Sequence, residues 1–357
     1  MRARAAVPAL LGVALLAMSA GEARAQGSHP SALVGAEFRS MSFGAALGVK
    51  SVREFVVPIG LVFPVSSRLT IDAGTNVVSA QRTDSAGGSV KLSGVTDVVV
   101  RGALQLKPDV AVFTVSVNLP TGHRTLGSNQ IGLASALATD LVPFPVTNFG
   151  SGFGVTTGLA LAAPVGPWAL GIAGSYRYTG SYQPLLDTSL TLTPGGEIRV
   201  RVGADRIVGQ GRVSLGVTYS TFSSDEFGGP RRPGKRVIPQ VSWSLPLGNN
   251  SLALYAWDLY RGAGTIDTVS SNTITAGAQL ALHSGRNLFR PQIEYRQSSG
   301  LISGRLIGVA ARYQIAAGER LSVVPGARFD VGSMKTDTGA SASLMGFSAS
   351  LMMRTTF

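Results

Sequence analysis

Arginines at every second position are the residues of this chain best suited to selecting or binding a charged molecule. Arg199 and Arg201 alternate with Ile198, Val200 and Val202. Neighbouring side chains of a β-strand point to opposite faces, so the two arginines share one face and the aliphatic side chains share the other. Charged side chains that line a water-filled passage select solutes by their charge. The pattern therefore predicts a positively charged face backed by an apolar one.

The same alternation places further charged side chains on this polar face. They are Arg101, Arg177, Arg199, Arg201, Arg290, Arg296, Arg312, Arg328 and Arg354, together with Asp72, Asp97, Asp205, Asp258, Glu294 and Asp330. In a strand that crosses a membrane, a charge facing lipid near the midplane costs ~2–4 kcal/mol, so such positions would line the inside. Two interpretations stay open. Arg199 and Arg201 give the interior a positive potential, or the arginines pair with carboxylates, as Arg290 would with Glu294 and Arg328 with Asp330, and only rigidify the wall.

Histidine and cysteine offer no catalytic or metal-binding pattern. The histidines, His29, His123 and His283, are more than ninety residues apart, and cysteine is absent. This spacing predicts no metal site, and the lack of thiols excludes disulfides and thiolate ligands. His283 precedes Ser284 at a predicted turn, where adjacent residues make poor catalytic partners. The sequence therefore predicts neither an enzyme nor a cofactor.

The N-terminal segment has the features of an export signal. Arg2 and Arg4 precede a short apolar run at 7–18, and Ala25 ends a small-x-small cleavage motif. The predicted divisions are a signal peptide at 1–25, a polar lead at 26–33 and one domain at 34–357.

The charge balance argues against nucleic acid as a partner. The chain of 357 residues has a net charge of +12, but its basic residues are scattered along the sequence. A nucleic-acid site needs a basic patch or stripe, which the sequence does not show. No later apolar run approaches the ~18 residues of a transmembrane helix. Apolar residues are instead distributed by alternation.

From Val34 on, the sequence reads as strands separated by turns. Tight turns are predicted at 64–67, 107–109, 164–167, 209–211, 248–250, 284–286 and 317–319. These seven hairpins, an opening strand at 34–47 and a closing strand make sixteen strands. The predicted fold is all-β, a transmembrane antiparallel up-and-down β-barrel of sixteen strands. If 34–47 instead folds inside as an N-terminal plug, fourteen strands are expected.

Longer polar loops are predicted between these hairpins. They lie at 49–53, 81–90, 120–149, 180–196, 224–235, 261–270, 298–304 and 333–342. The longest contains a predicted short helix at 128–141, with Ser128 or Asn129 as its cap. Leucines recur at every fourth residue of this segment and give it one apolar edge.

The longest loop is also expected to shape the passage. We hypothesise that 120–149 folds inward and brings Asp140, His123 and Arg124 opposite the arginine face. The alternative is a surface loop that packs over the rim of the barrel. Only the first arrangement would make the loop a constriction.

The last strand ends on an aromatic residue, Phe357. Phe347, Leu351 and Phe357 fall on its apolar side. This pattern is typical of the closing strand of an outer-membrane barrel, whose outer face meets lipid. We expect the strand to close the barrel against Met41–Leu47, and Phe357 to act as an assembly signal.

Two stretches resemble a known family. The G-x-x-D at 94–97, followed by L-P-T-G at 119–122, resembles a segment of proteins labelled "MetA-pathway of phenol degradation", and 152–180 is similar to the strand pair that follows. These are outer-membrane barrels distantly similar to long-chain fatty-acid and toluene transporters. The resemblance covers about a quarter of the chain and implies a passive channel for small aromatic or hydrophobic molecules, with no catalytic residue. The N-terminal hatch typical of fatty-acid transporters is not evident.

The expected function is a channel or facilitated transporter of the bacterial outer membrane. It would allow passive diffusion of small solutes, anionic or aromatic ones among them. Expected partners are outer-membrane lipid, small-molecule solutes and, during biogenesis, the barrel-assembly machinery; the oligomeric state stays open. The alternative is a structural or adhesive barrel that binds a partner through its loops.

Deletion of Phe357 tests the assembly signal. We expect less heat-modifiable barrel in outer-membrane fractions, because the terminal aromatic is proposed to be recognised during assembly. The conductance of molecules that do insert should not change. Wild-type barrel levels in the deletion would count against this role.

Overall fold

A closed β-sheet forms the body of the protein. The computed structural model describes residues 29–44, 47–265, 268–336 and 339–357. The predicted signal peptide, its cleavage site and residues 26–28 of the polar lead lie outside these residues. Within the described residues, no helix is long and apolar enough to cross a membrane.

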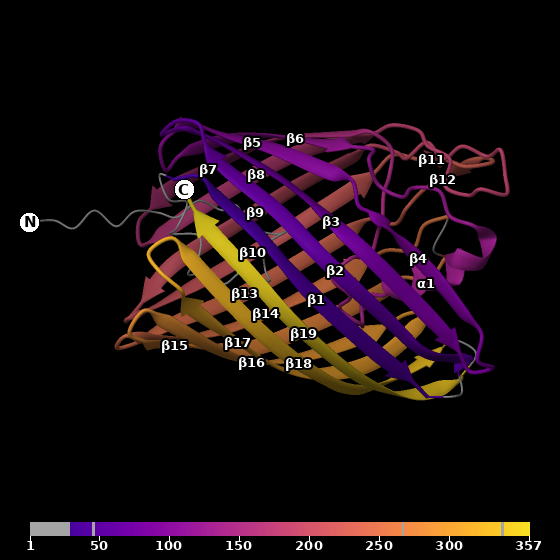
Figure 1. Cartoon of the computed structure of the whole chain (residues 1–357). Coiled ribbons are helices and arrows are strands. Elements are labelled where there is room, and N and C mark those ends of the chain that lie inside the picture. The colour runs from indigo at the N-terminus through magenta and orange to yellow at the C-terminus, as the bar shows by residue number, and fades with distance from the viewer. Residues whose placement is uncertain (1–28, 45–46, 266–267, 337–338) are drawn as a thin grey trace, which may run out of the picture.

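The wall is built from antiparallel strands that follow one another around the barrel (Figure 1). They are β1 (Ser31–Phe43), β2 (Val49–Pro64), β3 (Leu69–Asp84), β4 (Ser89–Val95), β5 (Val98–Lys107), β6 (Ala111–Leu119), β7 (Gly154–Val165), β8 (Trp168–Thr179), β9 (Glu197–Val208), β10 (Gly211–Phe222), β13 (Arg236–Leu247), β14 (Asn250–Arg261), β15 (Ser271–Ser284), β16 (Asn287–Ser299), β17 (Ile302–Ala316), β18 (Leu321–Thr336) and β19 (Ser341–Thr356). Because β4 and β5 pair with successive parts of β3, the 17-stranded sheet has sixteen wall positions. The predicted sixteen-stranded barrel is confirmed.

The first and last strands close the barrel. β1 pairs with β19 from Ser31 opposite Thr356 to Phe43 opposite Leu344, and it also pairs with β2. The alternative with fourteen strands and an N-terminal plug is therefore wrong. The expectation that the last strand closes the barrel against Met41–Leu47 is confirmed in part: Met41–Phe43 pair with Leu344–Gly346, whereas Phe347–Thr356 pair with Ser31–Ser40. In an antiparallel pair the C-terminal end meets the start of the first strand, and Phe357 N–H donates to Pro30 O at 2.9 Å.

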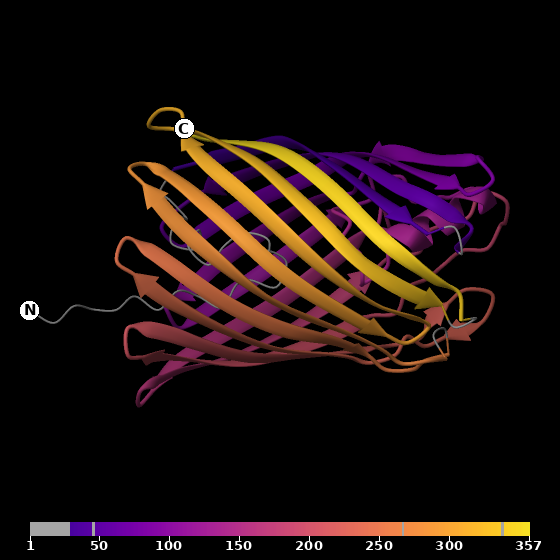
Figure 2. The same cartoon turned by 90° about the horizontal axis from the view of Figure 1, so that it is seen from below.

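The seven predicted tight turns are all present, at one end of the barrel that we call the turn end. Gly209 and Gly285 adopt φ of 61° and 58°, which favours glycine in short hairpin turns. Figure 2 shows these hairpins at the edge of the orange and yellow strands, on the same side as the C-terminus.

The opposite end, which we call the loop end, differs from the prediction. The loop at 180–196 is as expected, and the longest loop extends from Leu119 to Gly154. Loops expected at 49–53, 81–90, 298–304 and 333–342 are largely strand instead, and the connection after β16 has only two residues. The residues there are polar because β2, β3, β17, β18 and β19, with 15 or 16 residues each, continue beyond the apolar band of the outer surface. β11 (Asp225–Glu226) and β12 (Pro230–Arg231) form a small hairpin within the loop after β10.

The alternation of faces holds along the wall. On β19, Phe347 and Leu351 are about half exposed on the outside, whereas Ser348 is buried on the inside. One assignment was wrong: Asp258 lies opposite Ile274, which is 43% exposed on the outer face. Asp258 therefore faces outward.

A disulfide between β1 and β19 tests the closure. In Phe38→Cys/Ala349→Cys the two cysteines occupy directly opposed positions, so their Cβ atoms should lie close enough to form a disulfide. The chain has no other cysteine to compete. We expect rapid oxidation, read by loss of alkylation in the folded barrel. The control Phe38→Cys/Phe347→Cys, two residues out of register, should oxidise much more slowly; equal rates would contradict this register.

Candidate functional site

The loop between β6 and β7 lies inside the barrel. We call residues 120–149 of this segment the inner loop. Arg261 of β14 donates to the Asp140 carboxylate at 2.9 Å, and Val146 N–H donates to the Glu54 carboxylate of β2 at 3.2 Å. On the shorter way around the wall, six strands separate β2 from β14. A segment that contacts both must cross the interior, so the inward fold of the predicted loop is present.

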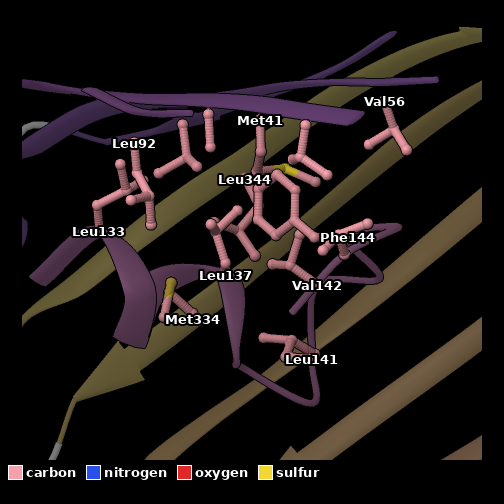
Figure 3. Packing of buried hydrophobic residues seen from close by; sticks show 14 of the residues in the cluster. Met41, Val56, Leu92, Leu133, Leu137, Leu141, Val142, Phe144, Met334 and Leu344 are labelled. Atoms are coloured by element: carbon pink, nitrogen blue, oxygen red, sulfur yellow. The ribbon is translucent and has the colours of Figure 1, made fainter. Parts of the chain in front are cut away.

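The apolar edge of the inner loop packs against the wall (Figure 3). The α-helix α1 (Ile131–Leu137) follows a 3₁₀ turn, and Leu133, Leu137 and Leu141 are fully buried. They join inward-facing apolar residues such as Met41 and Leu344 in one cluster. Each fully buried leucine contributes ~1.5–3 kcal/mol, so this contact holds the loop against β1–β4 and β17–β19. That side of the interior is filled.

The helical segment begins differently from the prediction. The 3₁₀ turn starts at Ser128, and the preceding residue Gly127 donates its N–H to Gln130 Oε1 at 3.0 Å. Neither Ser128 nor Asn129 caps it with a side chain. Ser128 N–H instead donates to the Asp187 carboxylate at 3.0 Å, and this bond holds the pKa of Asp187 below its ordinary value. The loop at 180–196 therefore braces the start of the helix.

Asp97 fixes both ends of the inner loop to the wall. It lies where β4 breaks into β5, and its carboxylate accepts hydrogen bonds from Asn118 Nδ2 at 2.7 Å, Gly122 N–H at 2.9 Å and Ser151 N–H at 2.8 Å. Asn118 lies at the end of β6, Gly122 at the start of the loop and Ser151 just after its end. Hydrogen bonds to a charged acceptor are roughly twice as strong as neutral ones. Asp97, predicted to line the passage, thus acts as a latch for the loop.

The glycines of the two short motifs are explained by this latch. A Cβ on Gly122 would lie 2.2 Å from Phe149 O and 2.7 Å from Asp97 N. A Cβ on Gly94 would lie 3.0 Å from His123 Cβ. Gly122 needs to be glycine because two backbone segments approach closely there, whereas Gly94 leaves room for the His123 side chain. The motif therefore positions the loop and carries no chemistry of its own.

Below the inner loop, buried charges form a network on one side of the lumen. Asp330 accepts from Arg39 at 2.7 Å and from Arg328 at 2.8 Å. Glu294 accepts from Arg328 at 3.0 Å and from Arg296 at 3.1 Å. Asp330 is fully buried, and Arg296, the most exposed member, keeps 18% of its side-chain surface. Such pairs rigidify the wall, and their charges are largely neutralised by each other.

The opposite wall carries arginines that remain at least partly exposed. We call this set the arginine wall, on β8, β9, β10, β13 and β14: Arg177, Arg199, Arg201, Arg212, Arg236 and Arg261. Arg177 and Arg199 both contact Glu197, at 3.7 and 2.8 Å, yet keep 52% and 40% of their side-chain surface exposed, against 3% for Glu197. The inward-facing positive charge on this side is therefore accessible to solvent, and carboxylates neutralise it only in part.

Small residues leave room beside the arginine wall. Ala160, Gly171, Ala173 and Gly203, on β7, β8 and β9, line a small pocket next to Arg201. Sixteen strands enclose more space than wall side chains can fill. The lumen is thus filled by the inner loop on one side and lined by short side chains and arginines on the other.

Most predicted charged positions face inward. By strand register they are Asp72, Arg101, Arg177, Arg199, Arg201, Asp205, Arg290, Glu294, Arg296, Arg312, Arg328, Asp330 and Arg354. Arg101 pairs with Asp72 at 2.8 Å, and the predicted pair of Arg328 with Asp330 is present. Pairing with carboxylates is thus observed on both sides of the lumen, and the positive potential around Arg199 and Arg201 stays a prediction.

The proposed constriction residues do not meet at one point. Asp140 contacts Arg261 of the arginine wall, as hypothesised, and its carbonyl accepts from Arg296 at 3.4 Å. His123 lies elsewhere, with its N–H donating to Val95 O on β4. Arg124 is exposed near the base of the loop. The expectation for His123 and Arg124 is wrong because the latch holds them at the wall.

Several lumen residues were missed. Arg236 and Arg261 stand at strand ends that border the predicted loops at 224–235 and 261–270, and the second of these loops was predicted to begin at Arg261 itself. Arg39 follows the alternation of the opening strand and could have been found by the same rule. Tyr255 and Trp257 stack on the inner face of β14 with ring centroids 5.4 Å apart. They were missed because Asp258, the residue after Trp257, was assigned to the inner face in their place.

Within the described residues, no group of three or more His, Cys, Asp or Glu is placed to hold a metal ion.

Comparison with known proteins gives only weak structural likeness. No protein-family model and no curated protein matches the chain. A COG4313 outer membrane channel from Pseudomonas putida F1 is 13% identical, with 92% of this chain and 96% of that chain covered and a TM-score of 0.38. Pseudomonas putida OprB is 9% identical (92% and 94% covered, TM-score 0.48), and the CymD monoaromatic hydrocarbon channel 11% (97% and 93%, TM-score 0.43). Because these TM-scores stay below 0.5, the fold assignment rests on the strand pairing of this chain.

Replacement of Asp97 tests the latch. In Asp97→Ala the N–H groups of Gly122 and Ser151 lose their acceptor, which costs on the order of 2 kcal/mol and loosens the base of the inner loop. We expect trypsin to cleave the folded barrel faster after the exposed Arg124, as measured by mass spectrometry. The control Glu319→Ala, at an exposed tight turn, should leave cleavage unchanged. Wild-type cleavage in Asp97→Ala would contradict the latch.

Proposed function

We propose that the protein is a passive diffusion channel of the bacterial outer membrane for small solutes. The observation that carries this proposal is the uneven lumen: one side is dry and filled by the inner loop, and the other is solvent-accessible and lined by arginines. A barrel whose interior served only as a scaffold would not need to leave Arg177 and Arg199 exposed on an inward face.

The outer surface supports a place in a membrane. Large apolar side chains are exposed at alternate positions around the wall, among them Phe55, Ile172, Ile293 and Phe329. In water such a surface would favour aggregation, whereas lipid covers it at no cost. The export signal at the N-terminus supports an outer membrane as the destination.

The charge balance of the open side favours anions. The arginine wall contributes six positive charges, and the carboxylates beside it are Glu197, Asp205 and Asp140, which leaves an excess of three. Rings of uncompensated positive charge favour anions in narrow pores. The stacked pair Tyr255 and Trp257 adds an aromatic surface to the lumen. Small anionic and aromatic solutes therefore fit the passage best.

An adhesive barrel is the second candidate. Leu186 and Leu190, in the loop at 180–196, are 63% and 44% exposed at the loop end. Exposed apolar side chains on a loop suit a protein partner. A liposome-swelling assay with sugars and aromatic acids separates the two functions, since only a channel gives swelling.

Variants of the open side test the channel in planar bilayers. Arg201→Gln/Arg236→Gln should lower the ratio of anion to cation permeability by a few fold, and Glu197→Gln should raise it. Deletion of 126–146 should increase single-channel conductance, because it removes the filling of one side. Arg206→Gln, on the outer face, is the control. Unchanged selectivity and conductance in all variants would contradict permeation past the arginine wall.

A further inference from the structure

Four basic side chains face outward near the loop end of one half of the barrel. Arg53 of β2, Lys91 of β4, Arg305 of β17 and Lys335 of β18 are all exposed. Register places them outside. Arg53 pairs with Ser40 and Lys91 with Gln81, and each lies one position from a buried inward residue of its own strand. We call these four residues the outer basic group.

Each member lies in the part of its strand that is close to the loop end of the barrel. Arg53 is the fifth residue of β2, Lys91 the third of β4, and Arg305 the fourth of β17. Lys335 is the last residue but one of β18. β2, β4 and β17 begin at the loop end, and β18 ends there. All four strands belong to the half of the wall that is closed by β1 and β19. The group therefore follows one rim of the barrel.

The outer surface changes character where the group begins. Toward the turn end, the outer face of these strands carries Phe55, Phe347 and Ile307. At the loop end it carries hydroxyl and amide side chains, and Ser79 Oγ and Ser93 Oγ lie 2.9 Å apart. Such a change marks the border between hydrocarbon and polar lipid headgroups. The basic side chains thus stand at headgroup level.

No carboxylate of the same surface neutralises this group. The acidic residues of β1, β2, β3 and β18 face the lumen: Glu37, Glu54, Asp72, Asp84 and Asp330. In the part of the chain that the structure describes, none of the four basic side chains forms an ion pair. The group carries four positive charges toward the membrane border.

The other half of the rim lacks this feature. In β6 to β10 and β13 to β16, the outward-facing side chains at the loop end are aromatic or neutral, as at Tyr178 and Tyr260. The exception among them is Asp258, which carries a negative charge. The outward Arg206 of β9 lies at the turn end and stacks on Trp168 at 5.4 Å. Among the outward-facing strand positions at the loop end, the basic residues therefore lie on one half of the rim. Arg231, Arg232 and Lys235 on the other half belong to the loop after β10.

We propose that the outer basic group binds the phosphate groups of a phosphorylated glycolipid in the outer leaflet. Lysine and arginine bind phosphate through charge-assisted hydrogen bonds, and the nearby hydroxyl and amide groups suit its sugar backbone. Arg305 and Lys335 lie on the adjacent strands β17 and β18, and Arg53 and Lys91 lie on β2 and β4, which both pair with β3. Each of these two pairs suits a headgroup that carries two phosphates at fixed positions better than it suits a single free phosphate. The inference depends on the proposed placement in the outer membrane, with the loop end outward, but not on conduction.

Native mass spectrometry of the purified barrel tests the proposal. The probes are lipid A with both phosphates, lipid A treated to remove them, and inorganic phosphate. The variant is Arg53→Gln/Lys91→Gln/Arg305→Gln/Lys335→Gln, and the matched control is Arg206→Gln/Arg286→Gln at the turn end. Planar-bilayer conductance of each protein is recorded in parallel.

The wild type and the control should bind bisphosphorylated lipid A at least ten times more tightly than the variant does, and more tightly than they bind the dephosphorylated lipid. Equal binding of both lipids by the wild type would overturn the proposal. So would equal binding by the variant, or competition by millimolar inorganic phosphate alone. Heat-modifiable migration shows that the variant is folded. A barrel that binds the lipid but never conducts would contradict only the channel.

Discussion

Closure of the strand circle is the constraint on which the rest of the structure depends. In a hydrocarbon environment every backbone N–H and C=O group of the wall needs a partner, and an open edge would leave a whole row unpaired. Pairing of β1 with β19 satisfies both edges and sets sixteen wall positions. A circle of that size encloses more volume than its own side chains fill. What occupies the interior therefore decides what the barrel can do.

The inner loop supplies that content on one side. Its leucines are buried against the wall, while a single carboxylate, Asp97, holds its two ends where β4 breaks into β5. Apolar burial contributes most of the free energy, and the hydrogen bonds to Asp97 decide where the loop starts and stops. Polar anchors at Asp140 and Glu54 then align the loop with opposite walls. A loop held this way fills one side of the lumen.

Charge in the lumen follows the same division. Around Asp330 and Glu294 the arginines are buried and paired, so their charges mainly stabilise the wall. Around Arg177 and Arg199 the side chains stay in solvent and share one buried carboxylate, Glu197. Identical residue types are thus buried in one wall and remain partly exposed to solvent on the other. The difference arises from which side the inner loop covers.

The sequence by itself determined the strand count, the seven turns and the face of nearly every charged side chain, because alternation and turn chemistry are local properties. It did not determine strand ends at the loop end, where polar residues on protruding strands look like loop, nor the face of Asp258, where the phase was one residue off. Only the tertiary structure decided that Asp97 is a latch and that His123 and Arg124 stay at the wall. Those outcomes depend on contacts between segments far apart in the chain, which no local pattern encodes.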